Sequence, residues 1–125
     1  MPDGASQFRE LWVESPDGKI LFALINSDVG WLMYLRGQGD AGFSSRNPEY
    51  SGPPDEKVKY KLNNGQVDYY PRAWAYPVAT VERALEHFRS TGSPPTFIEW
   101  HNDSGDGELI IPREPRHPGR SGRAR

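Results

Sequence analysis

The sequence predicts an α+β fold: a single antiparallel or mixed sheet of five to six strands with one main helix packed on one face. Three observations favour this fold class. Short segments that are apolar, or that alternate between apolar and polar residues, recur between turn residues and are typical of strands. One convincing segment has apolar residues at helical spacing. The length of 125 residues fits one domain and is too short for two ordinary ones.

The first three predicted strands lie in the N-terminal third of the chain. Residues 8–14 have a modest strand signal, and the turn Pro16-Asp17-Gly18 follows them. The unbroken apolar run within 19–26 is typical of a strand buried on both faces. A second apolar run at 31–35 comes after the turn residues 27–30. We expect the two apolar runs to be neighbouring central strands.

The segment 37–56 differs in composition from the strands around it. It is rich in Gly, Asp, Ser, Asn and Pro, and its two aromatic residues, Phe43 and Tyr50, stand alone. Connections in compact domains are usually shorter, and long ones are often functional or mobile. We therefore expect a long loop here.

A hairpin is predicted after this loop. Residues 57–62 alternate perfectly between lysines and the apolar residues Val58, Tyr60 and Leu62, as in a half-exposed antiparallel strand. Asn63-Asn64-Gly65 favours a tight turn because Asn and Gly accept a positive φ. Residues 66–70 are then the returning strand.

One helix is predicted after the hairpin. Pro77 suits its first position, where the missing N–H has no partner to lose. Gly92 can adopt the left-handed conformation that ends a helix, and Pro94 prevents continuation. The apolar stripe of this helix consists of Val78, Val81, Ala84, Leu85 and Phe88.

The C-terminal part of the domain is predicted to contain two more strands. A full strand at 96–101 and a short one at 108–111 flank the polar turn 102–107. The chain after it is rich in Arg, Gly and Pro and has almost nothing to bury. The expected division is a flexible N-terminus at 1–7, a single α+β domain at 8–111 and a disordered Arg-rich tail at 112–125.

Charge is distributed unevenly between the domain and the tail. Residues 112–125 carry five arginines and one acid, a charge of +4, whereas the net charge of the whole chain is −2. Residues 1–111 therefore carry −6. An acidic body repels phosphate backbones and suits a cationic partner surface. We expect no direct binding of nucleic acid, although an RNA-binding accessory module that uses the tail is one alternative.

Composition excludes several classes of site. The chain has no Cys, so disulfides, thiolate nucleophiles and Cys-based zinc or iron–sulfur centres are excluded. No apolar run is long enough to span a bilayer, and the first residues lack the parts of a signal peptide. The expectation is a cytoplasmic protein that has no membrane partner and no cofactor.

One polar cluster near residue 101 is the candidate for catalysis or metal binding. It combines His101 with Asp103, Asp106 and Glu108. The spacing does not match a calcium loop, and one His with scattered acids is a weak zinc pattern. A polar turn explains the same residues. We therefore predict no metal site and no catalytic residue, with a small hydrolase that uses His101 and Asp103 as the other alternative.

Aromatic and acidic residues in or beside the predicted loops favour a binding function. Tyr and Trp often dominate protein interfaces, and acidic groups steer a basic partner toward its site. Core packing is the better explanation for any single aromatic residue, but not for the whole set. The predicted partner-binding residues are Asp40, Phe43, Glu49, Tyr50, Asp55, Glu56, Asp68, Tyr69, Tyr70 and Trp74.

The order of several short segments resembles a family of bacterial immunity proteins, the first-numbered among the polymorphic-toxin immunity families. Each segment alone is unspecific, and their shared order carries the resemblance. The segments are Gly30-Trp31-Leu32-Met33-Tyr34-Leu35, Gly42-Phe43-Ser44-Ser45-Arg46-Asn47-Pro48, Asn64-Gly65-Gln66 with Asp68 and Tyr70-Pro71, and Ile98-Glu99-Trp100-His101 after the helix.

This resemblance implies a function. Members of the family neutralise a cognate secreted toxin, often a nucleic-acid deaminase, by tight non-covalent binding in the producing cell. A deaminase must present a basic groove to nucleic acid and a pocket for an extruded base. An acidic domain with exposed aromatic residues is suited to block such a cleft. The expected partner is therefore a toxin domain with a basic nucleic-acid-binding cleft.

Overall fold

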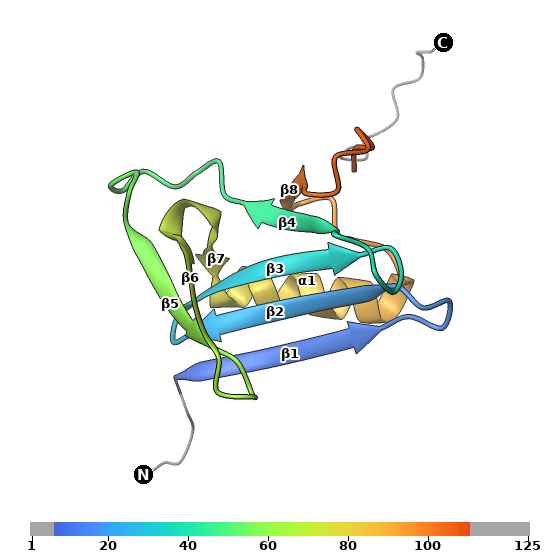
Figure 1. Ribbon diagram of the computed structural model, residues 1–125, viewed down its shortest axis with the longest axis horizontal. Coiled ribbons are helices and arrows are strands. Elements are labelled where there is room, and N and C mark those ends of the chain that lie inside the picture. Colours follow the sequence, from blue (N-terminus) through green and yellow to red (C-terminus); the bar gives the residue numbers. More distant parts are fainter. Residues whose placement is uncertain (1–6, 111–125) are drawn as a thin grey trace.

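The computed structural model describes residues 7–110 and confirms the α+β class (Figure 1). A six-stranded antiparallel sheet carries one long helix, and a hairpin forms a separate two-stranded sheet. The main sheet contains β1 (Phe8–Glu14), β2 (Ile20–Asn26), β3 (Val29–Leu35), β4 (Phe43–Arg46), β7 (Tyr76–Pro77) and β8 (Glu99–Asn102). The other elements are β5 (Lys57–Lys61), β6 (Val67–Pro71), the 3-10 helix η1 (Arg72–Trp74) and α1 (Val78–Thr91).

The sheet has the order β1-β2-β3-β4-β8, with β7 beside the first half of β3. The two apolar runs, β2 and β3, are neighbours, which confirms the expectation from the sequence. One row of residues crosses the whole sheet, because each member lies opposite the next: Trp12, Phe22, Met33, Ser44 and His101. Residues opposite one another in an antiparallel pair share a face. The row therefore marks one face of the sheet from edge to edge.

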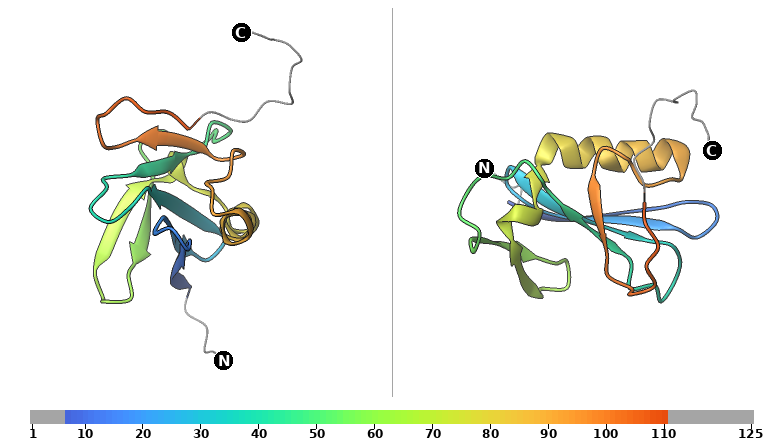
Figure 2. Two further views of the ribbon diagram at one scale, coloured as in Figure 1. Left: turned by 90° about the vertical axis from the view of Figure 1, so that its right-hand side faces the viewer. Right: turned by 90° about the horizontal axis from the view of Figure 1, so that it is seen from above.

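Helix α1 covers the other face (Figure 2). Its residues Val81, Ala84, Leu85 and Phe88 are buried against the sheet, as the apolar stripe predicts. Gly92 ends the helix in the left-handed conformation, with φ at 72°. Pro77 precedes the first helical residue instead of occupying it, a shift of one position.

The hairpin of β5 and β6 packs on the face opposite the helix, so the sheet separates two cores (Figure 2). Val58 and Tyr60 of β5 are buried against Phe22, Leu24 and Trp31, which confirms the alternation seen in the sequence. The lysines between them point outward and are exposed. The single sheet expected from the sequence is therefore accompanied by a second, smaller one.

Ser45 of β4 connects β3 to η1. It is fully buried, near the point where the pairing partner of β3 changes from β7 to β4. The backbone N–H of Leu32 donates a hydrogen bond to Ser45 Oγ at 3.1 Å, and Ser45 Oγ donates to the carbonyl oxygen of Trp74 at 2.9 Å. The hydroxyl group thus replaces ladder hydrogen bonds at the gap.

Several predicted boundaries are wrong. The strand expected at 96–101 begins only at Glu99, and β3 begins at Val29, within the turn expected at 27–30. Residues 43–46 of the expected long loop form β4, and Phe43 is buried in the core with 1% of its surface exposed. No strand is present at 108–110, because Glu108 is bound to Arg36 and these residues pair with no strand of the described chain. Predictions for residues 1–6 and 111–125 lie outside the described residues. Across residues 7–110, no helix has the length and apolarity needed to cross a membrane.

Candidate functional site

Most of the predicted partner-binding residues lie on the hairpin and the segments that flank it. Glu49, Tyr50, Asp55 and Glu56 precede β5, whereas Asp68, Tyr69, Tyr70 and Trp74 belong to β6 and η1. Asp40 and Phe43 do not join them. Asp40 lies in the connection between β3 and β4, and the buried Phe43 belongs to the core against the helix.

Tyr70 and Trp74 are packing residues of a continuous aromatic row. Tyr70 stacks on Trp31 with 4.4 Å between ring centroids, and Trp74 stacks on Tyr70 at 6.0 Å. The guanidinium carbon of Arg46 lies 3.7 Å from the ring centroid of Trp74. The row continues in the other direction from Trp31 through Phe22 to Trp12. These contacts bind β6 and η1 to the sheet.

Tyr69 is the predicted aromatic residue that is free to contact a partner. It lies on the outer face of β6, and 58% of its surface is exposed. Tyr50 is half-buried, and its hydroxyl group donates a hydrogen bond to the carbonyl oxygen of Pro53 at 2.7 Å. Tyr69 is therefore the strongest anchor candidate on the hairpin.

The hairpin is not as acidic as the sequence suggested. Glu56 is paired with Arg72 at 2.8 Å, and Asp68 accepts hydrogen bonds from Gln66 and Tyr70. Lys57, Lys59 and Lys61 are exposed on the same element. Glu49 and Asp55 are exposed and form no ion pair within residues 7–110. The hairpin and its flanking segments therefore carry basic as well as acidic groups.

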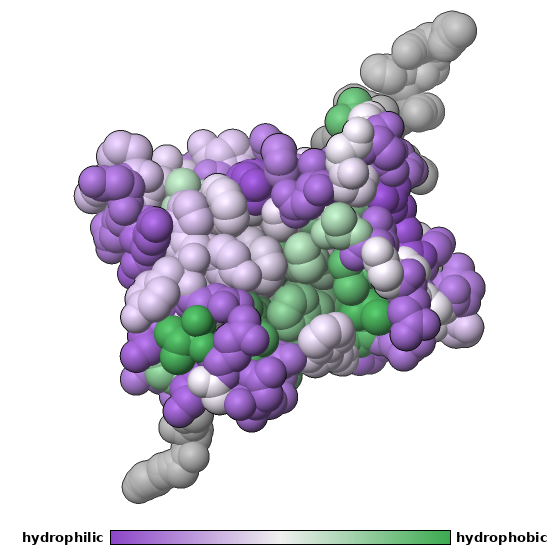
Figure 3. Space-filling view, in the orientation of Figure 1, coloured by the Kyte–Doolittle hydropathy of each residue, from purple (hydrophilic) through white to green (hydrophobic). Residues whose placement is uncertain are grey.

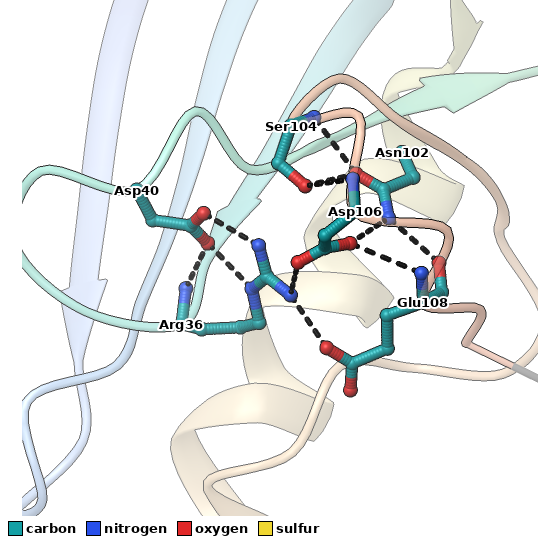
Figure 4. A network of polar contacts seen from close by, with 6 residues as sticks. All are labelled: Arg36, Asp40, Asn102, Ser104, Asp106 and Glu108. Carbon is teal, nitrogen blue, oxygen red and sulfur yellow. Dashed lines mark hydrogen bonds and ion pairs between the residues drawn. The ribbon is translucent and has the colours of Figure 1, made fainter.

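Asp40 belongs to a network centred on Arg36 (Figure 4). Arg36 Nη2 and Nε donate to the two carboxylate oxygens of Asp40 at 2.7 and 2.8 Å, and Nη1 donates to Asp106 and Glu108. Hydrogen bonds from Arg36 hold the pKa of Asp40 well below its usual range. The backbone N–H of Glu108, with Asn102 and Arg36, does the same for the pKa of Asp106. The network ties the 36–42 connection to the loop after β8.

The polar cluster around His101 does not form a Ser-His-Asp triad. Ser44 Oγ donates to Asp103 Oδ2 at 2.7 Å, and His101 Nε2 lies 3.6 Å from Asp103 Oδ1. The carboxylate therefore stands between the hydroxyl group and the imidazole, whereas a serine nucleophile needs the imidazole in the middle. Asp106 and Glu108 are paired with Arg36 instead of joining His101. Residues 7–110 contain no group of three or more side chains placed to hold a metal ion.

A shallow cavity lies between the start of α1 and the segment before β8. It has a volume of about 410 Å³, and Tyr76 forms part of its wall. The guanidinium carbon of Arg83 lies 4.5 Å from the ring centroid of Phe97 at its rim. The Tyr76 hydroxyl group is already bonded, donating to Arg46 O and accepting from the N–H of Glu99. Glu49, Thr80 and Arg83 also line the cavity.

The sequence analysis missed an apolar surface on the face that the hairpin covers only in part. We call this surface the open face, and Figure 3 shows its more hydrophobic part as a green area beside the hairpin, bordered by hydrophilic residues. The register places its members on one side of β1, β2 and β3. They are Trp12, Ile20, Phe22, Met33 and Leu35.

Trp12 is the most exposed member of the open face, with 53% of its surface accessible. Its ring lies over Phe22, 4.4 Å between centroids, and its indole N–H donates to Glu10 Oε2 at 2.6 Å. Glu10 Oε1 accepts the backbone N–H of Asn63 in the hairpin turn. The indole is thus held in place although it is exposed. Alternation within β1, which buries Leu11 and Val13 on the other side, could have revealed it.

The structure as a whole defines a class: a small α+β protein whose candidates for function are exposed side chains around a hairpin and an open sheet face. Comparison with family models makes this class specific. The model of immunity protein Imm1 matches residues 4–102, and the chain belongs to this family. The family gives the chain an immunity role and implies a cognate toxin protein as its partner. No curated protein and no solved structure matched the chain significantly.

Proposed function

We propose that this chain neutralises a secreted bacterial toxin of the nucleic-acid deaminase type, by tight non-covalent binding in the cytoplasm of the producing cell. The bound chain covers the substrate cleft of the toxin and excludes nucleic acid from it. The observation that carries the proposal is the match of residues 4–102 to the Imm1 immunity family.

Electrostatics supports this kind of partner. A deaminase presents a basic groove to phosphate groups and a pocket that holds an extruded base. Residues 7–110 contain fifteen acidic and ten basic side chains. A domain with this excess of acid repels nucleic acid and is attracted to the surface that binds it. Opposite charges also accelerate the encounter of the two proteins.

On the hairpin side, Tyr69 and Asp55 are the proposed contacts with the toxin. Tyr69 offers a large exposed ring, and Asp55 is exposed and has no ion pair within residues 7–110. Glu49 is also exposed, but it lines the cavity beside Phe97. The other predicted residues of this region support the surface from below or beside it. They are Tyr50, Glu56, Asp68, Tyr70 and Trp74.

The test is an inhibition assay with the toxin domain encoded next to this chain. Deamination of single-stranded DNA and RNA oligonucleotides is followed while the full chain is added in steps. We expect activity to fall linearly and to vanish at one equivalent, as tight 1:1 binding requires. Deamination that persists at a large excess of the chain would contradict the proposal. Inhibition of a toxin with another chemistry would leave the immunity role intact and exclude the deaminase.

A further inference from the structure

The open face is an unpartnered surface whose two halves differ chemically. Toward the hairpin, Trp12 lies over Phe22, and the half-buried Met33 lies opposite Phe22 on the next strand. Toward the other end of the strands, Ile20 and Leu35 lie opposite one another, and Glu14 lies opposite Ile20. The apolar surface is therefore bordered at this end by an acidic residue, Glu14, and we call this border the acidic edge.

A hollow marks this acidic edge. It has a volume of about 380 Å³ and is lined by Glu14, Asp17, Gly18, Ile20, Gly37 and Gln38. The carboxylate of Glu14 has no hydrogen bond or ion pair within residues 7–110. Asp17 shares its charge with Lys19, at 3.3 Å. The hollow therefore has room and an unpaired negative charge for a basic side chain.

Charge around the open face is strongly asymmetric relative to the rest of the molecule. Nine carboxylates lie on this face of the sheet, on the adjoining side of β6 or in the loops at its end, against four basic groups, one of which, Lys59, lies over the ring of Phe8 on this face. The remaining described residues contain six acidic and six basic side chains. The nine are Glu10, Glu14, Asp17, Asp40, Asp68, Glu99, Asp103, Asp106 and Glu108, and the four are Lys19, Arg36, Arg46 and Lys59.

We propose that the open face is the docking surface for a basic segment of the toxin, in which an apolar side chain packs on Trp12 and Met33 and a lysine or arginine enters the hollow beside Glu14. This inference rests on the proposed function for the identity of the partner. Trp12 is suited to be the anchor because its contacts with Phe22 and Glu10 fix the ring before binding. A fixed anchor loses little conformational entropy when the partner arrives.

Substitutions of Met33 test the charge of the partner. Met33→Lys and Met33→Glu replace the same side chain with polar ones of similar length and opposite charge. We expect Met33→Lys to weaken binding of the neighbouring toxin domain at least tenfold more than Met33→Glu, because a basic segment is repelled by the new lysine. Equal effects of the two variants would overturn the proposal.

Substitutions of aromatic residues test the position of the surface. Trp12→Ala should weaken binding at least about 30-fold, mainly through faster dissociation, as hot-spot residues do. Phe97→Ala is the matched control, since Phe97 is also exposed but lies by the cavity near α1, and it should change the Kd less than threefold. Thermal unfolding of each variant checks that the fold is retained.

The outcomes separate this inference from the proposed function. Failure of the parent chain to bind the toxin would overturn both. Binding by the parent that is unchanged in Trp12→Ala and Met33→Lys would overturn the docking surface and leave the immunity function standing. Light scattering of the free chain provides a further check. A dimer that Trp12→Ala dissociates would assign the open face to a second copy of this chain and overturn the proposal.

Discussion

Two buried tyrosines differ in what their hydroxyl groups contact. The Tyr76 hydroxyl group donates to Arg46 O at 2.6 Å and accepts the N–H of Glu99 at 3.0 Å, which joins β7, β4 and β8. The Tyr60 hydroxyl group is buried between the hairpin and the sheet and has no hydrogen-bond partner within the described chain. Burial raises the pKa of both phenols. Tyr60 therefore loses contact with water and gains no hydrogen bond in return.

The same substitution should have opposite effects at these two positions. Tyr60→Phe removes an unsatisfied polar group, and we expect the free energy of unfolding to rise by about 1 kcal/mol. Tyr76→Phe leaves a carbonyl oxygen and an N–H without a partner, and the free energy of unfolding should fall by about 1–3 kcal/mol. Urea unfolding at pH 7 measures both. A destabilised Tyr60→Phe would show that its hydroxyl group has a partner in solution.

At the scale of the elements, the Arg36 network holds together two connections that have little apolar packing. Arg36 binds Asp40 in its own connection and reaches Asp106 and Glu108 in the loop after β8. The pKa of Asp40 and that of Asp106 are both depressed. A carboxylate whose pKa is depressed by folding stabilises the fold at pH values above its unfolded pKa, near 3.9. This contribution is lost as the pH falls below that value and through the lower pKa of the folded state.

Arg36→Met should therefore make the fold less stable at neutral pH. It should also make the stability depend less on pH in the acidic range. We expect the unfolding temperature of the parent to fall steeply below about pH 4, and that of Arg36→Met to be lower at pH 7 and to fall less on acidification. Arg89→Met is the control, because Arg89 and Glu86 form an exposed pair on α1 whose loss should have little effect. Parallel pH curves for the parent and Arg36→Met would contradict the role given to the network.

The elements that the sequence predicted best are those with a strong local pattern. The hairpin was identified from the lysine alternation and Asn63-Asn64-Gly65, and the helix from its stripe and Gly92. Strand β4 was missed because Phe-Ser-Ser-Arg is short and polar, and it becomes a strand through its pairing with β3 and β8. A strand that depends on such tertiary contacts need not show a periodic pattern of apolar residues in its own sequence.

The same reason explains the errors in the predicted site. An acid and a basic residue that are paired in space, such as Glu56 and Arg72, look like two free charges in a sequence. Phe43 looked like an isolated loop aromatic because its burial depends on strands that lie elsewhere along the chain. The exposed position of Trp12, by contrast, can be predicted from the sequence, because the alternation along β1 places it on the opposite side from Leu11 and Val13.

At the scale of the whole molecule, the strands and helices found in residues 7–110 lie between residues 8 and 102, and the family match ends at residue 102. We expect deletion of residues 112–125 to leave the unfolding temperature unchanged, because these elements supply both cores. Thermal unfolding followed by circular dichroism measures this, with the full chain as reference. A fall of many degrees would show that the Arg-rich segment contributes to the folded domain.

The hairpin forms a sheet of its own, so residues on its outer side can be substituted without changes in the main sheet. Because β5 and β6 share no ladder with the other strands, substitutions on their outer side leave the register of the main sheet untouched. The core beneath α1 lies on the other side of the sheet and does not include residues of the hairpin. In the proposed complex, substitutions on the outer side of the hairpin can therefore follow changes in the toxin surface without changes in the rest of the fold.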